Sequence, residues 1–432
     1  MTDLNTSAAF LRDLLQKAGV TGYAIELSES ENRELNTEQQ NFTLYRTMFN
    51  HSASVTAYIA GRKGAASGTD LTEEGLKELV EDACAAAQSA EPDDANGYAE
   101  HEPQETFTLG PLQPDMERFH DRLRELMDTV ARDYPKILLM QIVASHHTGH
   151  RLYENAGGVR FEAYEGEYSV MLEYAGHEGD ATTGLAAGSI TLRDLDTPIL
   201  DHGLLRKQLR DTEDSLVTCP VGGKFTGTVI LTPDALAYFT YMLISNYMSA
   251  GVIMDGTSQW LDKMDTPVVS DKITLRLQAE DDRLVLPAPF TSDGYRAENV
   301  TLIDRGVLRA NILNLYAARK TGRPVTKNTG TAFVMDPGDT PAADMIKSVR
   351  RGLIVGGFSG GQPGANGEFS GVAKNSFYVE DGEIRGAVME TMISGNLADL
   401  FTQVTAVSRE LFSDGTLAFP YMACEGITIS GN

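Results

Sequence analysis

The chain has 432 residues, of which 42% are hydrophobic and 22% charged, and its formal net charge is −25 at pH 7. This length exceeds what one ordinary hydrophobic core supports, so two domains are expected. The negative charge argues against nucleic acid and anionic membrane surfaces as partners, because phosphate binding needs clustered Lys and Arg.

The N-terminus and the cysteines predict a cytoplasmic protein. The first residues, MTDLNTSAAFLRDLLQ, lack the basic region and apolar run of a signal peptide. The longest nearly apolar run, residues 235–244, is too short to span a bilayer. Three widely separated cysteines, Cys84, Cys219 and Cys424, suit reduced thiols better than a disulfide framework.

Residues 1–220 are predicted to form the first domain, a sheet flanked by helices. Apolar residues recur at helical spacing in AAFLRDLLQKAG (8–19), from residue 70 onwards with a stripe that reaches Ala87, and in DMERFHDRLRELMDTVARDYP (115–135). The segments YAIELSES (23–30), SVTAYIAGRKGAAS (54–67) and 136–176 alternate as strands do. A further helix is predicted near 192–212, and Pro220-Val221-Gly222-Gly223 marks the boundary.

Residues 221–432 are predicted to form a second domain that is richer in strands and glycine. Residues 228–231 suit a strand, Thr232 a helix cap and Pro233 a first helical turn, with Gly251 as the stop. Two segments, NVTLIDRGVLRANIL (299–313) and SFYVEDGEIRGAVME (376–390), predict hairpins around tight turns. Helices are predicted near 340–353 and 396–412.

The histidines and glycines exclude several common enzyme classes. No histidine follows His202. The G-x-S-x-G pattern at 357–361 therefore lacks the later histidine of a serine hydrolase, and the glycine-rich residues after it cannot form the required helix. Neither G-x-G-x-x-G nor a P-loop occurs in this segment. The acidic groups at 281–282 and 380–383 are predicted to be solvated turns.

The glycine-rich stretch from 356 to 371 has two interpretations. Gly360, Gly361, Gly364 and Gly367 permit close approach of another backbone, so a peptide or a neighbouring subunit could bind there by strand addition. Equally, the stretch could be a loop folded on itself. Both interpretations stay open at this stage.

The cluster His146, His147 and His150 resembles a metal-binding sequence. On a strand, however, adjacent residues point to opposite faces, so His146 and His147 cannot converge without a bend. No Cys or carboxylate nearby completes a ligand set. We therefore predict a polar hairpin tip at this position rather than a metal site.

Several longer motifs resemble the TldD/PmbA family, and within it the PmbA (TldE) branch. They include SVTAYIAGRKGAASGTDLTEEGLKELVEDACAAA, RLYENAGGVRF, ENVTLIDRGVLRANILNLYAARKTG, GEFSGVAKNSFYVEDGEIRGAVMETMISGNLADLF and the terminal FPYMACEGITISGN. The resemblance implies a two-domain α+β protein, with an N-terminal sheet flanked by helices and curved antiparallel sheets in the C-terminal domain. It also implies cytoplasmic zinc metalloproteolysis of unfolded peptides, and it brings the label "modulator of DNA gyrase".

The sequence departs from this family's catalytic pattern. The TldD branch carries H-E-x-x-x-H on the helix after a strand, together with a Cys near the C-terminus. Tyr241, Met242 and Asn246 stand at the equivalent positions, and no His or Glu lies between 228 and 251. Cys424 falls inside the last predicted strand, beyond the segment where the ligand belongs. The comparison therefore predicts no catalytic residues and no metal site in this chain.

The resulting prediction is a PmbA/TldE-like subunit of a TldD/TldE-type protease acting on unfolded peptides. Zinc is expected only in the TldD-type partner, and the net charge gives no support to a direct action on gyrase. Two alternatives remain: a stand-alone peptidase or hydrolase with a non-standard site, and a homo-oligomeric peptide-binding protein. Whether the chain is itself an enzyme stays open.

Overall fold

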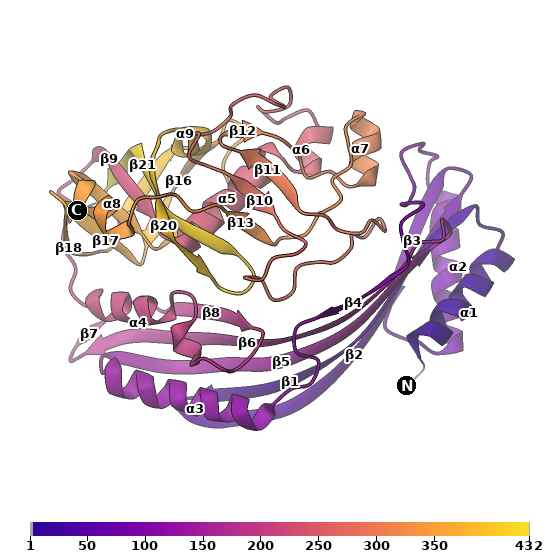
Figure 1. Cartoon of the computed structure of the whole chain (residues 1–432), viewed down its shortest axis with the longest axis horizontal. Helices are drawn as coiled ribbons and strands as arrows, with labels where there is room; N and C mark the ends of the chain where they lie inside the picture. Colours follow the sequence, from indigo (N-terminus) through magenta and orange to yellow (C-terminus); the bar gives the residue numbers. More distant parts are fainter. Residues whose placement is uncertain (1–2, 432) are drawn as a thin grey trace.

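The computed structural model describes residues 3–431 as two large β-sheets that lie face to face, with helices on their outer sides and between them (Figure 1). Every strand of the first sheet precedes residue 193, and every strand of the second follows residue 224. The α+β fold class is therefore confirmed. The domain ranges 1–220 and 221–432 stay predictions; Thr218 already pairs with Ala387 in the second sheet.

The first sheet is a long curved layer with the strand order β3-β2-β1-β5-β6-β4, and β7 and β8 also pair with β6. Only β4 joins in parallel. The β1–β2 hairpin closes through Gln39 and Gln40, both at positive φ, which is the two-residue turn that matches the sheet twist. The strands are β1 Gly22–Glu38, β2 Asn41–Ile59, β3 Arg62–Gly68, β4 Glu105–Leu109, β5 Ile137–Asn155, β6 Arg160–Glu178, β7 Ala181–Thr182 and β8 Ala186–Leu192.

Helices cover the two ends of this sheet because their apolar stripes bury against it. Leu11 of α1 and Ala83 of α2 belong to one buried cluster with Leu27 at one end, and Phe119 of α3 belongs to another with Ile142 at the other end. The predicted helix near 192–212 starts later than expected, since β8, a short 3₁₀ turn and a loop occupy its first half. The helices are α1 Leu4–Lys17, α2 Glu73–Ser89, α3 Met116–Asp133, η1 Ile199–Asp201 and α4 Leu205–Asp214.

The second sheet has the central order β12-β11-β10-β13-β21-β9-β14-β17-β18, with β15, β16, β19 and β20 attached. It is mostly antiparallel, with parallel pairs between β9 and β14 and between β13 and β21. Its strands are β9 Phe225–Leu231, β10 Leu275–Leu277, β11 Val300–Asp304, β12 Val307–Leu308, β13 Phe333–Met335, β14 Arg351–Val355, β15 Gly357–Gly360, β16 Glu368–Lys374, β17 Ser376–Glu380, β18 Glu383–Val388, β19 Met392–Asn396, β20 Val404–Ser413 and β21 Ala418–Ser430.

The helices of the second half are shorter than the sequence predicts. The prediction of a helix over 396–412 is wrong after Thr402, because residues 404–413 form β20 and pair with β21. Residues 351–355 form β14 rather than the end of a helix. Gly251 does not end a helix but lies inside a separate short one. The helices are α5 Pro233–Tyr247, α6 Ala250–Met254, α7 Leu315–Thr321, α8 Ala342–Ser348 and α9 Leu397–Thr402.

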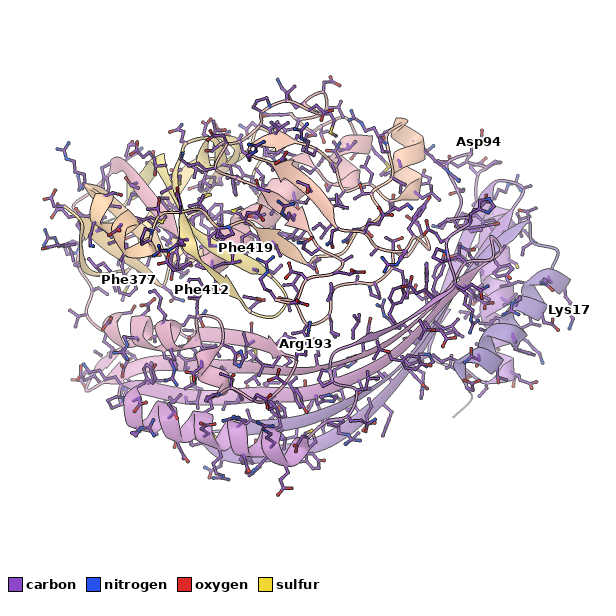
Figure 2. All side chains as sticks on the ribbon, viewed as in Figure 1. Lys17, Asp94, Arg193, Phe377, Phe412 and Phe419 are labelled. Atoms are coloured by element: carbon purple, nitrogen blue, oxygen red, sulfur yellow. The ribbon has the colours of Figure 1, made fainter. Side chains whose placement is uncertain are left out.

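Side chains fill the space between the two halves (Figure 2). Arg193, just after β8, donates to the carbonyl of Leu284 in the second half (2.7 Å). At the other end of the first sheet, Lys320 pairs with Asp93 (2.7 Å). No helix within residues 3–431 is long and apolar enough to cross a membrane.

Candidate functional site

The element expected to carry the site is the β9–α5 unit at the centre of the second half. β9 lies between β21 and β14, and Val229, Ile230 and Leu231 are fully buried there. Thr232 caps α5 by accepting a hydrogen bond from the amide of Ala235 (3.4 Å). The predicted strand, cap and helix start are thus present.

The three positions that stand for the family's zinc motif lie in different environments. Tyr241 is 54% exposed, whereas Met242 is fully buried in the core and Asn246 is partly buried. Because Met242 is buried in the core whereas Tyr241 is exposed, the two side chains do not face one site here. A phenol, a thioether and an amide in this arrangement do not fit zinc, which takes imidazole, thiolate or carboxylate ligands.

Cys424 is also unsuited to hold a metal. It is fully buried on β21, directly opposite Val229 of β9, and its Sγ lies 3.6 Å from the carbonyl oxygen of Val229. Burial raises its pKa to about 12, which keeps the thiol protonated. Within residues 3–431 no group of three or more His, Cys, Asp or Glu side chains is arranged to hold a metal ion.

Comparison with known proteins identifies the family. The PmbA/TldA metallopeptidase C-terminal domain matches residues 224–431, and the PmbA/TldA metallopeptidase domain 1 matches residues 23–87. This chain belongs to the PmbA/TldD family. The metalloprotease PmbA homolog of Haemophilus influenzae is 24% identical over 449 residues, covering 100% of this chain and 96% of that protein. The metalloprotease PmbA of Escherichia coli O157:H7 is 24% identical, covering 86% of this chain and 85% of that protein.

Two solved structures share the fold. TldE from Thermococcus kodakarensis superposes with a TM-score of 0.84 at 19% identity, covering 98% of this chain and 100% of that one. A candidate modulator of DNA gyrase from Bacteroides thetaiotaomicron has the same TM-score at 20% identity, with both chains fully covered. The expected family and architecture are thereby confirmed.

The glycine-rich stretch beside α5 folds back on itself as a hairpin, with strands at its flanks, and whether a peptide binds there stays a prediction. Gly357–Gly360 form β15 and pair with β16, with Gly360 opposite Gly371. In the tip, 361–367, Pro363 is half-buried and Gly367 is buried, whereas the other residues are exposed. Within residues 3–431 the second edge of β15 pairs with no strand. Ser359 lies exposed on this short strand, which excludes a nucleophile elbow.

Aromatic side chains join this hairpin to the exposed side of α5. Phe358 of β15 packs between Phe239 (ring centroids 5.0 Å apart) and Tyr238 (6.2 Å) of α5. Tyr238 and Tyr241 are 38% and 54% exposed and lie three residues apart, so they are neighbours on the helix. The open edge of β15 together with Tyr238 and Tyr241 forms what we term the α5–β15 surface.

Gly367 anchors the hairpin tip to the C-terminal end of α5. It has a φ of +81°, and a Cβ placed there would lie 2.1 Å from the hydroxyl of Tyr247. Tyr247 is fully buried and stacks on Trp260 with ring centroids 4.6 Å apart. Its hydroxyl, Thr240 Oγ1 and Asn246 Nδ2 are buried without hydrogen-bond partners in the described part of the chain.

The histidines predicted to form a hairpin tip instead lie in the middle of β5, because the strand runs unbroken to Asn155. His146 is buried and donates from Nε2 to the carbonyl of Pro111 (2.8 Å), and burial lowers its pKa. His147 points to the opposite face, and burial lowers its pKa as well. His150 stacks on Tyr164 (4.3 Å). The three side chains do not converge.

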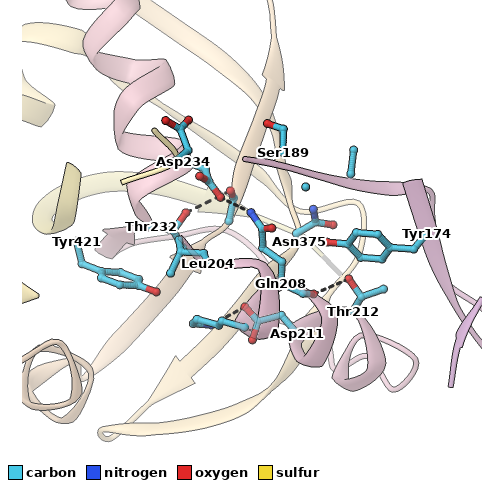
Figure 3. Close-up of a pocket in the computed structure, with 15 residues that line it drawn as sticks. Tyr174, Ser189, Leu204, Gln208, Asp211, Thr212, Thr232, Asp234, Asn375 and Tyr421 are labelled. Carbon is cyan, nitrogen blue, oxygen red and sulfur yellow. Dashed lines mark hydrogen bonds and ion pairs between the residues drawn. The ribbon is translucent and has the colours of Figure 1, made fainter. Parts of the chain in front are cut away.

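Sequence reasoning missed a cavity of about 310 Å³ between the two halves (Figure 3). Gln208 of α4 donates to Asp234 at the start of α5 (2.7 Å), which links the first half to the second. Asp234 is exposed to the cavity, but the surrounding protein still raises the pKa of its carboxyl. Burial also raises the pKa of the Asp211 carboxyl. In the sequence, Asp234 fits only the first turn of a helix, so no sequence pattern predicted its hydrogen bond with Gln208.

Proposed function

We propose that this chain is a zinc-free PmbA/TldE-type subunit that works with a TldD-type protease in the cytoplasm. The observation that carries the proposal is that Tyr241, Asn246 and a fully buried Met242 stand where the family's zinc motif is expected on α5. The partner would supply the zinc and the hydrolysis. This chain would supply a wall of the chamber that receives unfolded peptides.

The α5–β15 surface is the part of this chain that would contact the peptide. An extended peptide can add to the open edge of β15 through main-chain hydrogen bonds, as in other strand-addition complexes. Tyr238 and Tyr241 would lie beneath its side chains and provide sequence-tolerant apolar contact. Such contacts suit unfolded substrates, because they read the backbone more than the sequence.

Metal analysis and a peptidase assay test the missing zinc site. We expect the purified chain to contain no stoichiometric zinc and to leave an unfolded fluorescent casein intact, with or without a chelator. One tightly bound zinc per chain together with chelator-sensitive cleavage would contradict the proposal. Activity that survives chelation but disappears in His146, His147 or His150 variants would favour a stand-alone enzyme.

Co-purification from the native cell tests the partnership. We expect a second chain carrying H-E-x-x-x-H to elute with this one, and zinc-dependent cleavage of casein to appear in that fraction. Recovery of this chain with bound peptide and without a protease would favour the homo-oligomeric peptide-binding alternative. Tyr241→Ala should weaken peptide binding measured by fluorescence anisotropy, whereas Leu185→Ala, an equally exposed apolar position in the first half, should not.

A further inference from the structure

The cavity of about 310 Å³ between the two halves has no part in the role proposed above. α4, β6 and β8 of the first half line one side of it, and the start of α5, β21 and the turns beside them line the other (Figure 3). The volume is at the lower end of the range of small-molecule sites, which is about 300–1,000 Å³. The cavity is therefore large enough for a small molecule but not for a folded partner.

Two buried tyrosine side chains end in this cavity. Tyr174 of β6 is 1% exposed and Tyr421 of β21 is 7% exposed. Figure 3 shows their rings entering from opposite sides, with the hydroxyls turned toward the space between them. The Tyr174 hydroxyl lies near Thr212, whose own hydroxyl donates to the carbonyl of Gln208 (2.9 Å). Among residues 3–431 the Tyr421 hydroxyl has no hydrogen-bond partner, and only the main chain of this residue is bonded.

Gln208 adds a second polar group without a partner. Its Nε2 donates to Asp234, but its Oε1 is buried and accepts no hydrogen bond in the described part of the chain. Buried polar groups of native proteins are nearly always bonded to protein, water or a ligand. A molecule in the cavity would therefore meet two groups that the protein itself leaves unsatisfied, the Tyr421 hydroxyl and Gln208 Oε1.

The charged groups that face the cavity are mostly acidic. Three are carboxylates, from Asp211, Asp234 and Asp414, and one is a cation, Lys207. Lys207 already pairs with Asp211 (2.5 Å), whereas Asp234 and Asp414 pair with no cation among residues 3–431. The surrounding protein raises the pKa of Asp234, and burial raises that of Asp211, because charged carboxylates are costly in these surroundings. A bound cation would offset that cost.

We propose that this cavity is a binding site for a small organic cation that carries a primary ammonium group. An ammonium group has three donors and no acceptor. It would meet acceptors from both halves: the second carboxylate oxygen of Asp234, Oε1 of Gln208 and the hydroxyl oxygen of Tyr421. An anion would be repelled by the carboxylates, and a neutral molecule of the same size would leave their charge uncompensated. The inference goes beyond the role proposed above and does not depend on a protease partner.

Calorimetric titration of the full chain with 1,4-diaminobutane tests the site. We expect one molecule bound per chain at neutral pH, with a Kd of about 1 mM or tighter. The neutral analogue 1,4-butanediol and the anion succinate have the same chain length and should not bind. Because the ligand contacts both halves and binds only the folded chain, 1,4-diaminobutane should also raise the melting temperature, and 1,4-butanediol should not.

Variants locate the binding on the molecule. Asp234→Asn keeps an acceptor for Gln208 but loses the charge, so it should weaken binding about tenfold or more. The matched control is Asp344→Asn, which removes an exposed carboxylate from the first turn of another helix, α8, and should leave the Kd unchanged. Tyr421→Phe removes only an unbonded hydroxyl, so it should fold normally and weaken binding about threefold or more.

The outcomes separate a specific site from general attraction to an acidic chain. Circular dichroism and the melting temperature without ligand show whether each variant folds; if Asp234→Asn does not fold, Tyr421→Phe decides alone. Absence of binding, equal binding of 1,4-butanediol, or several weak sites per chain would overturn the inference. Unchanged binding in the folded cavity variants, or an equal loss in Asp344→Asn, would overturn it as well.

Discussion

Replacing Gly367 by alanine adds a single methyl group, yet it should strongly destabilise the second half of the molecule. Gly367 has a φ of +81°, a conformation that costs a residue with a Cβ about 1–2 kcal/mol. The new Cβ would also lie 2.1 Å from the Tyr247 hydroxyl. Tyr247 cannot swing away freely, because it is fully buried and stacked on Trp260, so relieving this overlap costs about 1–3 kcal/mol more. The expected total is about 2–5 kcal/mol.

Thermal unfolding separates the two contributions. At about 2–4 °C per kcal/mol for a domain of this size, Gly367→Ala should lower the melting temperature by roughly 4–20 °C. Combining Gly367→Ala with Tyr247→Phe removes the hydroxyl. The double variant should therefore regain the stability lost to the steric overlap but not the stability lost to the positive φ. Gly361→Ala is the matched control, since nothing lies within 4 Å of its added Cβ, and should leave the melting temperature nearly unchanged. Equal effects at 361 and 367, or no recovery on adding Tyr247→Phe, would refute the reasoning.

Three further predictions follow from burial. Met242→Ala should lower the free energy of unfolding in urea by about 2–5 kcal/mol, as expected for a fully buried methionine, whereas Tyr241→Ala should change it by less than about 0.5 kcal/mol. The surroundings of Asp234 raise the pKa of its carboxyl above the unfolded value of about 3.9. The stability that this carboxyl contributes is therefore fully present below about pH 4 and is lost as the pH rises through the folded pKa. The melting temperature of the wild type should therefore fall relative to that of Asp234→Asn between pH 4 and 7, and parallel pH profiles would contradict this. Cys424 should resist a thiol reagent at pH 8 until the protein is denatured, because burial raises its pKa to about 12; rapid labelling in the folded state would show that β21 opens.

The fold was predictable where a segment's own pattern decides its structure. The strand, cap and helix start at 228–233 needed only β-branched residues, a threonine and a proline, and all three act as expected. The segment 404–412 was predicted to be helical because Val404, Val407 and Leu411 are spaced like the apolar stripe of a helix. Pairing of this segment with β21, a contact between distant parts of the chain that no local pattern contains, makes it a strand instead.

The surroundings of the candidate site were predictable only in part. The absence of His and Glu from α5 was visible in the sequence, but the burial of Met242 and the exposure of Tyr241 depend on what packs against the helix. The glycines read as a loop because glycine favours turns, although Gly360 and Gly371 in fact face each other across a strand pair. The cavity between the two halves was invisible for a similar reason, since residues far apart in the chain line it.

Packing around α5 adds to the residue identities as an argument against a zinc site on this helix. A glutamate at position 242 would have to place its carboxylate among Leu236, Phe239 and Leu243 in the core, without a charged partner. The helix therefore cannot be returned to a metal site by exchanging three side chains; its neighbours would have to change as well.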